Sequence, residues 1–234
     1  MEQPLDRAAL VERLRAVGMT HYHDKHPFHR NMNEGKLTPD QVRGWVINRF
    51  YYQRNIPIKD AALISNCPIR EVRRVWLHRI SDHDGLKEGE GGIEAWLKLG
   101  EASGISREDL LSGKGLLPKA KAAVDSYVNF VRTKSWPVGI ASSLTELFAP
   151  DLMKERILAF EKYYTWVKPW GLEYFRSRVS QAKTDSDQGL DLVFTYCNTH
   201  ELQEEAVKAL SFKCGLLWDL LDAMAEAYGG GKAE

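Results

Sequence analysis

The sequence predicts an all-α protein with a single domain, residues 1–234, built as a bundle of about seven helices. Apolar residues recur every three or four positions through most of the chain, and no segment shows the alternation typical of a β-strand. No glycine- or serine-rich linker, internal repeat or low-complexity block divides the chain. A chain of 234 residues can bury a core large enough to enclose a pocket.

Capping residues and chain breakers mark the ends of the expected helices. Thr38 and Gln41 can form a capping box, and Pro57 is expected to bend the helix that follows. We expect helices over residues 38–64, 67–84, 93–102 and 118–136, and a short turn capped by Ser106. Another helix is expected to run up to residue 148, new helices to start at residues 150 and 169, and a last helix to cover residues 199–228.

The last of these helices carries a buried seam. Its apolar residues alternate spacings of three and four, at Val207, Leu210, Cys214, Leu217, Leu221, Met224 and Tyr228. Three glycines starting at Gly229 end the helix, and the tail after about Tyr228 is expected to be mobile.

The composition excludes several classes of function. Lys+Arg and Asp+Glu are both 32, whereas nucleic-acid-binding proteins usually carry a basic excess. No apolar run approaches the ~18 residues of a membrane span, and residues 1–14 contain no apolar signal-peptide core. Cys67, Cys197 and Cys214 are far apart and odd in number, which indicates reduced thiols in the cytoplasm and no zinc motif.

Polar residues interrupt the apolar face of the helix that follows Thr38. Arg49 and Lys59 lie on a stripe of otherwise apolar residues, with Gln53 on the same side. A buried cation is costly unless an anion meets it. Two interpretations stay open: an internal ion-pair network, for which Asp60 is a candidate partner, or a pocket for a ligand that carries carboxylates.

The same anomaly recurs on two later helices. Arg79 and His83 are one helical turn apart and would face the same cavity, and Tyr174 and Arg178 form a second pair with this spacing. A lone buried histidine is usually a hydrogen-bonded core residue, and an aromatic stripe is more often core than site. For His83, the preceding arginine and the adjacent turn favour a functional site.

A carboxylate and a lysine complete the set of polar candidates. Glu146 lies among small polar residues on an expected helix face, as either a pocket residue or a buried acid paired with an arginine such as Arg156. Lys213 flanks the seam of the last helix and can reach inward or extend to solvent. Together, these residues place cations from four helices where they could converge on one cavity.

Two other arrangements could hold a metal ion. The segment from His21 to His29 is dense in histidine, but it is irregular and contains Pro27, so helical spacing does not set the ring directions. A di-iron site would need a histidine one or two turns after Glu146, and the residue seven positions on is Met153, a poor iron ligand. The sequence disfavours both sites, and we expect no bound metal.

The chain contains several long, distinctive motifs: Tyr22-His23, Asn48–Gln53, Ile56–Ala62, Asp82–Gly85, Gly91–Leu97, Ser142–Pro150 and Tyr174–Arg178. Together they resemble the motifs of the pyrroloquinoline-quinone synthase family. The similarity extends from about residue 20 to Tyr228, and motifs this long and this numerous are very specific.

The resemblance implies a haem-oxygenase-like, TenA-like helical bundle that forms a homodimer in the cytoplasm. It implies an oxidoreductase that closes a ring in a tricarboxylic amino-quinone precursor and oxidises it to pyrroloquinoline quinone. O2 would be the acceptor, H2O2 the by-product, and no metal or organic cofactor would be used. The expected partners are the precursor and O2, without nucleic acid or membrane. A tricarboxylate would explain several inward cations without internal acid partners.

The resemblance also implies residue roles. His83, Tyr174 and Arg178 are expected around the oxygen and proton-transfer site, where a His83 with a pKa near neutral would shuttle protons. The expected substrate-binding residues are Tyr22, His23, Arg49, Gln53, Arg79, Tyr127, Thr145, Glu146, Arg156 and Lys213. One departure is Met153, where many members of the family have a histidine that helps to line the oxygen side.

Two further functions belong to other classes. A thiaminase-like hydrolase of the same bundle type would need a nucleophilic cysteine in the pocket, and none of the three cysteines has a clear partner. A helical carrier would bind the finished quinone without converting its precursor.

Overall fold

The computed structural model describes residues 3–229, except the side chains of Ser180 and residues 182–184. This part of the chain contains helices and no strand, so the predicted all-α class is confirmed. Its α-helices are α1 (Arg7–His21), α2 (Pro27–Asn33), α3 (Pro39–Asn66), α4 (Arg70–Asp84), α5 (Gly91–Ala102), α6 (Arg107–Ser112), α7 (Pro118–Thr133), α8 (Trp136–Ala141), α9 (Ala149–Tyr163), α10 (Glu173–Tyr196) and α11 (His200–Tyr228). Three short 3-10 helices are η1 (His23–Lys25), η2 (Leu144–Leu147) and η3 (Pro169–Leu172).

The predicted number of about seven helices is too low, since residues 3–229 form eleven α-helices. Short helices such as α2, α6 and α8 are separated from their longer neighbours by only a few residues. The three-to-four periodicity continues across such short breaks, so it does not reveal them.

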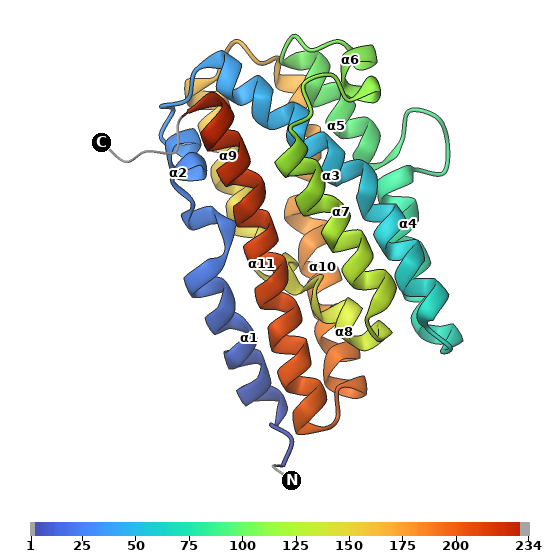
Figure 1. The fold of residues 1–234 in the computed structure, drawn as a ribbon. Helices are drawn as coiled ribbons and strands as arrows, with labels where there is room; N and C mark the ends of the chain where they lie inside the picture. Colours follow the sequence, from blue (N-terminus) through green and yellow to red (C-terminus); the bar gives the residue numbers. More distant parts are fainter. Residues whose placement is uncertain (1–2, 230–234) are drawn as a thin grey trace.

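The bundle is organised around α3 and α11. Helix α3 contacts α4, α5, α7 and α11, while α11 also contacts α1 and α8. Figure 1 shows α1, α11 and α7 side by side, with α4 at the opposite edge and α10 behind them. Helix α10 in turn packs against α8, α9 and η2. Chain segments distant in sequence therefore meet at the centre of the bundle.

The expected capping signals begin helices at the predicted places. Thr38 and Gln41 form a capping box at the start of α3, and Thr199 accepts a hydrogen bond from Leu202 at the start of α11. Helix α3 then continues through Pro57 to Asn66. Leu210, Cys214, Leu217, Leu221 and Met224 of the predicted seam are buried, and the tail residues 230–234 lie outside the described part.

One expected helix has a different structure. The prediction of a continuous helix up to Phe148 is wrong, because α8 ends at Ala141 and η2 follows at Leu144–Leu147. The hydroxyl of Ser142 donates to the carbonyl of Gly139 at 2.6 Å, a local bond that competes with regular helical bonding. The resulting tight turn directs Ser143, Thr145 and Glu146 to the interior of the bundle.

Two hydrophobic clusters flank the centre of the bundle. One contains Trp45, Trp96 and Phe175, and the other contains Trp76 with residues of α8 and α11. Tyr52 and Met153 contact both clusters. The polar site described below lies between the two clusters.

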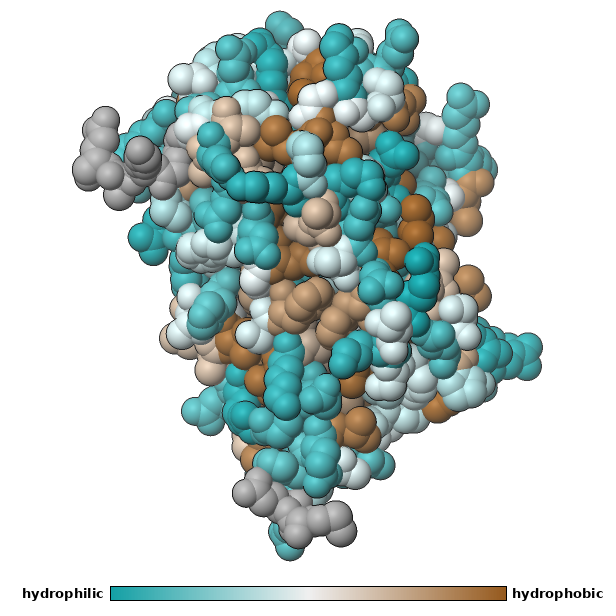
Figure 2. All heavy atoms as spheres, viewed as in Figure 1, coloured by the Kyte–Doolittle hydropathy of each residue, from teal (hydrophilic) through white to brown (hydrophobic). Residues whose placement is uncertain are grey.

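The surface differs clearly from this interior. Figure 2 shows hydrophilic residues over most of one face, with hydrophobic residues dispersed among them. No helix among residues 3–229 is long and apolar enough to cross a membrane. Cys67, Cys197 and Cys214 are buried and free.

Candidate active site

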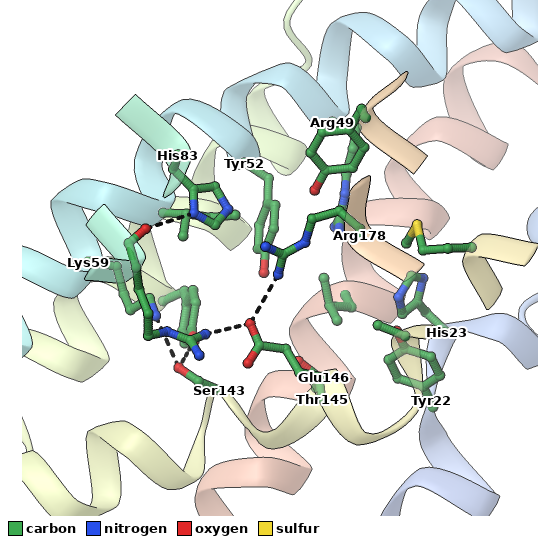
Figure 3. Close-up of a pocket in the computed structure, with 17 residues that line it drawn as sticks. Tyr22, His23, Arg49, Tyr52, Lys59, His83, Ser143, Thr145, Glu146 and Arg178 are labelled. Carbon is green, nitrogen blue, oxygen red and sulfur yellow. Dashed lines mark hydrogen bonds and ion pairs between the residues drawn. The ribbon is translucent and has the colours of Figure 1, made fainter. Parts of the chain in front are cut away.

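A polar cavity lies at the centre of the bundle, where segments from α3, α4, α7, η1, η2, α9, α10 and α11 meet. About 60 Å³ of it is open to water-sized molecules. Figure 3 shows charged and aromatic side chains pointing into it from these elements. The residues that line it are Tyr22, His23, Arg49, Tyr52, Ile56, Lys59, Arg79, His83, Tyr127, Ser143, Thr145, Glu146, Ala149, Met153, Tyr174, Arg178 and Leu217.

One half of the cavity contains cations with acidic partners. Glu146 forms ion pairs with Arg79 and, at 3.4 Å, with Arg178 (Figure 3). Asp185 lies 3.6 Å from Arg79 and 3.4 Å from Arg178. Burial opposes the ionisation of Glu146, but the two arginines outweigh it and keep its pKa below the usual value. Burial and the Glu146 carboxylate raise the pKa of Asp185 to about 6.

Lys59 belongs to the same charge-compensated half. Its ammonium donates to Asp60 at 2.5 Å and to the Ser143 hydroxyl at 3.0 Å. The indole nitrogen of Trp76 also donates to Asp60, at 2.6 Å. Burial would lower the pKa of Lys59, but the charge of Asp60 outweighs it and raises that pKa. The ion-pair interpretation of Lys59 is therefore confirmed.

On the other side of the cavity, three cations have no carboxylate within ion-pair distance among the described residues: Arg49 lines the cavity, whereas Arg156 and Lys213 lie next to it. Arg49 lies over the Tyr52 ring at 3.9 Å, and Arg156 hydrogen-bonds the sulfur of Met32. Lys213 donates to the Tyr52 hydroxyl at 2.7 Å, and its ammonium lies 3.3 Å from the centre of the Tyr127 ring. These rings stabilise a cation only partly. This half of the site is therefore suited to an anionic ligand.

The pKa values of Lys213 and Arg156 reflect their burial without a carboxylate partner among the described residues. Burial, with Arg49 and Lys59 nearby, holds the pKa of Lys213 well below its usual value. Burial also lowers the pKa of Arg156, to about 9. An anion bound beside these groups would raise both pKa values, because it favours the charged forms.

His83 is oriented by its own helix. Its Nδ1 donates to the carbonyl of Arg79 at 3.1 Å, since a carbonyl can only accept (Figure 3). Burial and the charge of Arg178 lower the pKa of His83 to about 4. The expectation of a pKa near neutral is therefore wrong for the ligand-free protein. In this state His83 is neutral, with Nε2 available as a proton acceptor.

A smaller inner chamber of about 20 Å³ lies behind the cavity. It is lined by His23, His29, Trp45, Arg49, Gln53, Trp96, Leu152, Met153, Arg156, Tyr174 and Phe175. His23, Arg49, Met153 and Tyr174 also line the central cavity, so the two spaces share a wall. The Tyr174 hydroxyl donates to Gln53 Oε1 at 3.0 Å within this wall.

The structure brings the sequence-predicted residues together. All of them line the central cavity except Gln53 and Arg156, which line the inner chamber, and Lys213, which lies behind Tyr52 and Tyr127. One expectation is wrong in part, because Arg79 and Arg178 have internal acid partners. Glu146 both lines the cavity and pairs with arginines, although its partners are Arg79 and Arg178 and not Arg156.

Sequence reasoning missed some residues of the site. Tyr52 is one helical turn after Arg49, so its place on that stripe was a usable signal. Asp185 lies two turns after Arg178 on α10, on the same face, which was a weaker signal. Nothing in the sequence pointed to Ser143 as the partner of Lys59.

The candidate metal ligands do not converge. Among residues 3–229, no group of three or more His, Cys, Asp or Glu side chains is arranged to hold a metal ion. His21 contacts Thr20, His26 pairs with Asp222 at 3.0 Å, and His23 contacts His29. The histidines of this segment therefore make separate contacts and do not come together around one point.

Sequence comparison places the chain in a family. It belongs to the TENA/THI-4/PQQC family, whose model matches residues 11–223. A pyrroloquinoline-quinone synthase from Cronobacter sakazakii is 54% identical over 92% of this chain and 85% of the relative. The enzyme of the same name from Pseudomonas aeruginosa is 50% identical over 96% of this chain and 89% of its own length.

Solved structures show the same fold at low identity. A Shewanella denitrificans domain with a heme oxygenase-like fold matches with a TM-score of 0.79 at 15% identity, over 96% of this chain and 94% of that chain. A TenA homologue from Pseudomonas syringae matches with a TM-score of 0.76 at 14% identity, over 97% and 99% of the two chains. The expected haem-oxygenase-like bundle is therefore confirmed.

Proposed function

We propose that this protein is an oxidoreductase that catalyses the final step in the biosynthesis of pyrroloquinoline quinone. Its substrate would be a tricarboxylic amino-quinone precursor, which is ring-closed and oxidised by O2 with release of H2O2. The observation that carries this proposal is the half of the site formed by Arg49, Arg156 and Lys213, three cations that have no carboxylate partner among the described residues. The similarity to enzymes named pyrroloquinoline-quinone synthase supports it.

The substrate would replace internal contacts when it binds. The central cavity offers about 60 Å³, whereas pockets for organic ligands usually measure roughly 300–1,000 Å³. Side chains must therefore move, and Arg79 and Arg178 can exchange the carboxylate of Glu146 for one of the substrate. Arginine suits this exchange because its planar group binds carboxylates with two parallel hydrogen bonds.

The residues around the cavity can serve each chemical step. Ring closure is an intramolecular attack of the amine on the quinone ring, so positioning by the cations lowers its barrier. Each later two-electron oxidation removes two hydrogens from the ligand and reduces one O2 to H2O2. Neutral His83 would accept the carbon-bound proton through Nε2. Arg178 and Tyr174 would stabilise the negative charge that develops on reduced oxygen.

The electron-rich reduced ligand can itself supply electrons to O2, so we propose that the reaction needs no metal or organic cofactor. Activity that disappears with a chelator and returns with iron would contradict this part. We further propose a homodimer, which light scattering of the purified protein tests. A cytoplasmic location fits three buried, free cysteines.

A turnover assay tests the proposed function. Purified protein mixed with the precursor and O2 should produce pyrroloquinoline quinone and H2O2, followed by absorbance and a peroxide assay. A carrier would give binding spectra in a single turnover without conversion. The hydrolase alternative lacks support, because no cysteine lines the cavity and burial raises the pKa of Cys214 to about 12.

A further inference from the structure

Three buried polar atoms without a hydrogen-bond partner in the described structure belong to residues that line the inner chamber. They are His29 Nε2, Trp45 Nε1 and Gln53 Nε2, on side chains that are only 3%, 4% and 1% exposed. Native proteins almost always satisfy such groups. The chamber of about 20 Å³ is larger than the roughly 10–15 Å³ that one water requires. It is too small for an organic ligand.

The surroundings of His29 determine which of its ring nitrogens carries the hydrogen. Its Nδ1 lies 3.1 Å from the carbonyl oxygen of His23 and 3.0 Å from the Nδ1 of His23. A carbonyl only accepts, so His29 Nδ1 carries the hydrogen and shares it between both acceptors. Burial and the charge of Arg156 hold the pKa of His29 well below its usual value. Neutral His29 therefore presents Nε2 as an acceptor.

The other two groups are donors. The indole nitrogen of Trp45 only donates, and its ring centre lies 6.2 Å from that of His29. Gln53 accepts from Tyr174 through Oε1, which leaves its amide hydrogens for the chamber. Two donors and one acceptor around a space of this size match a single water molecule, which can donate and accept at once.

We propose that the inner chamber binds one water molecule, which is hydrogen-bonded to His29, Trp45 and Gln53. Because this water donates to His29 Nε2, the hydrogen of His29 stays on Nδ1, and His29 is a positioning residue that keeps His23 in its Nε2–H tautomer. Because His23 Nδ1 accepts from His29, the hydrogen of neutral His23 must be on Nε2. The chain of hydrogen bonds then runs from Tyr174 through Gln53, the water and His29 to His23. Its use in proton transfer to the quinone rests on the proposed function, whereas its existence does not.

Nitrogen-15 NMR of the histidine side chains tests the tautomers without substrate. At neutral pH we expect the hydrogen of His29 on Nδ1 and that of His23 on Nε2. A His29 with its hydrogen on Nε2, or with both nitrogens protonated, would overturn the inference even if the enzyme turns over. A high-resolution crystal structure should show the water within hydrogen-bond distance of all three atoms, and direct protein partners at those atoms would equally overturn it.

Variants of His29 test its positioning role. His29→Phe removes the donor, so we expect a mixture of His23 tautomers. We also expect kcat to fall by up to about tenfold, with a smaller change in KM. His29→Asn retains a donor near the Nδ1 position and should restore the His23 tautomer and part of kcat. His21→Asn, on an exposed residue of the same segment, is the control. Unchanged tautomer and kcat in a folded His29→Phe protein would contradict the role, and the wild-type spectra decide the matter if this variant does not fold.

Discussion

At the residue scale, the chemistry of His83 depends on what surrounds it. The ring is buried beside Arg178, and its Nδ1 is bonded to the Arg79 carbonyl. Burial and the charge of Arg178 make the neutral form dominant, and the bond from Nδ1 to the carbonyl leaves Nε2 as the single nitrogen for the ligand. A bound anion would screen Arg178 and raise the pKa of His83 toward neutral, so substrate binding itself can tune the proton acceptor.

His83→Asn should bind the quinone with nearly wild-type affinity but turn the precursor over on the order of a hundredfold more slowly or worse, because it removes the proton acceptor. Product absorbance and quinone titration measure the two effects separately. His78→Asn is the matched control, since His78 is exposed on the same helix. Full wild-type turnover by the His83 variant would contradict the assignment.

Lys213 should take up a proton when an anionic quinone binds, because the ligand charge raises its lowered pKa. Calorimetry at several pH values in buffers of different ionisation enthalpy measures this uptake. Lys213→Gln should reduce it and weaken binding by at least about tenfold. Lys208→Gln, on the exposed side of α11, is the control. Equal proton uptake by wild type and Lys213→Gln would refute the prediction.

At the element scale, α3 supplies residues to both halves of the site. It is held to α4 by the contact between Asp60 and Trp76, and Asp60 in turn holds Lys59. The capping box at Thr38 defines where α3 begins, and hence which of its residues face the cavity. The turn between α8 and η2 then brings Ser143 to Lys59 from the other side.

Trp76→Phe should lower the free energy of unfolding by about 1–3 kcal/mol, because Asp60 loses a buried hydrogen bond. Urea unfolding followed by circular dichroism measures the change. Trp170→Phe, at a residue that is 52% exposed, should leave the stability nearly unchanged. If both variants were equally stable, the α3–α4 contact would contribute little.

At the scale of the whole molecule, the interior contains charges that the bundle only partly compensates. The pairs around Glu146 and Asp60 neutralise one half of the site, whereas Arg49, Arg156 and Lys213 have no carboxylate partner among the described residues. The three cations repel one another, which destabilises the folded protein. A bound anion would offset this repulsion and stabilise the fold. A bound quinone should stabilise the fold by an amount that rises with the logarithm of its concentration above Kd.

Acid should destabilise the protein through its buried histidines. Burial lowers the pKa values of His23, His29 and His83 in the folded state, so below pH about 6.5 the unfolded chain binds more protons. The free energy of unfolding should therefore fall as pH decreases, by up to about 1.4 kcal/mol per pH unit for each histidine. Asp185, whose pKa is raised to about 6, offsets part of this loss.

Urea unfolding between about pH 7 and pH 5 measures the acid effect. His83→Asn should make the slope shallower by up to one proton, whereas His21→Asn should not change it. A free energy of unfolding that is constant over this range would show that the three histidines are not held neutral in the folded protein.

The sequence by itself determined the helical class, the starts of α3 and α11 and the buried seam of α11, because helical periodicity and capping are local properties. Polar interruptions of the apolar stripes indicated Arg49, Arg79 and His83, whereas Tyr22, His23, Tyr127 and Thr145 followed only from the family resemblance. Only the tertiary structure decided which buried cations are compensated. Glu146 meets Arg79 and Arg178 across three separate elements, and the turn after α8 depends on local hydrogen bonds that periodicity does not report. Charge compensation and pKa values depend on distances through space, so they are set when the helices pack.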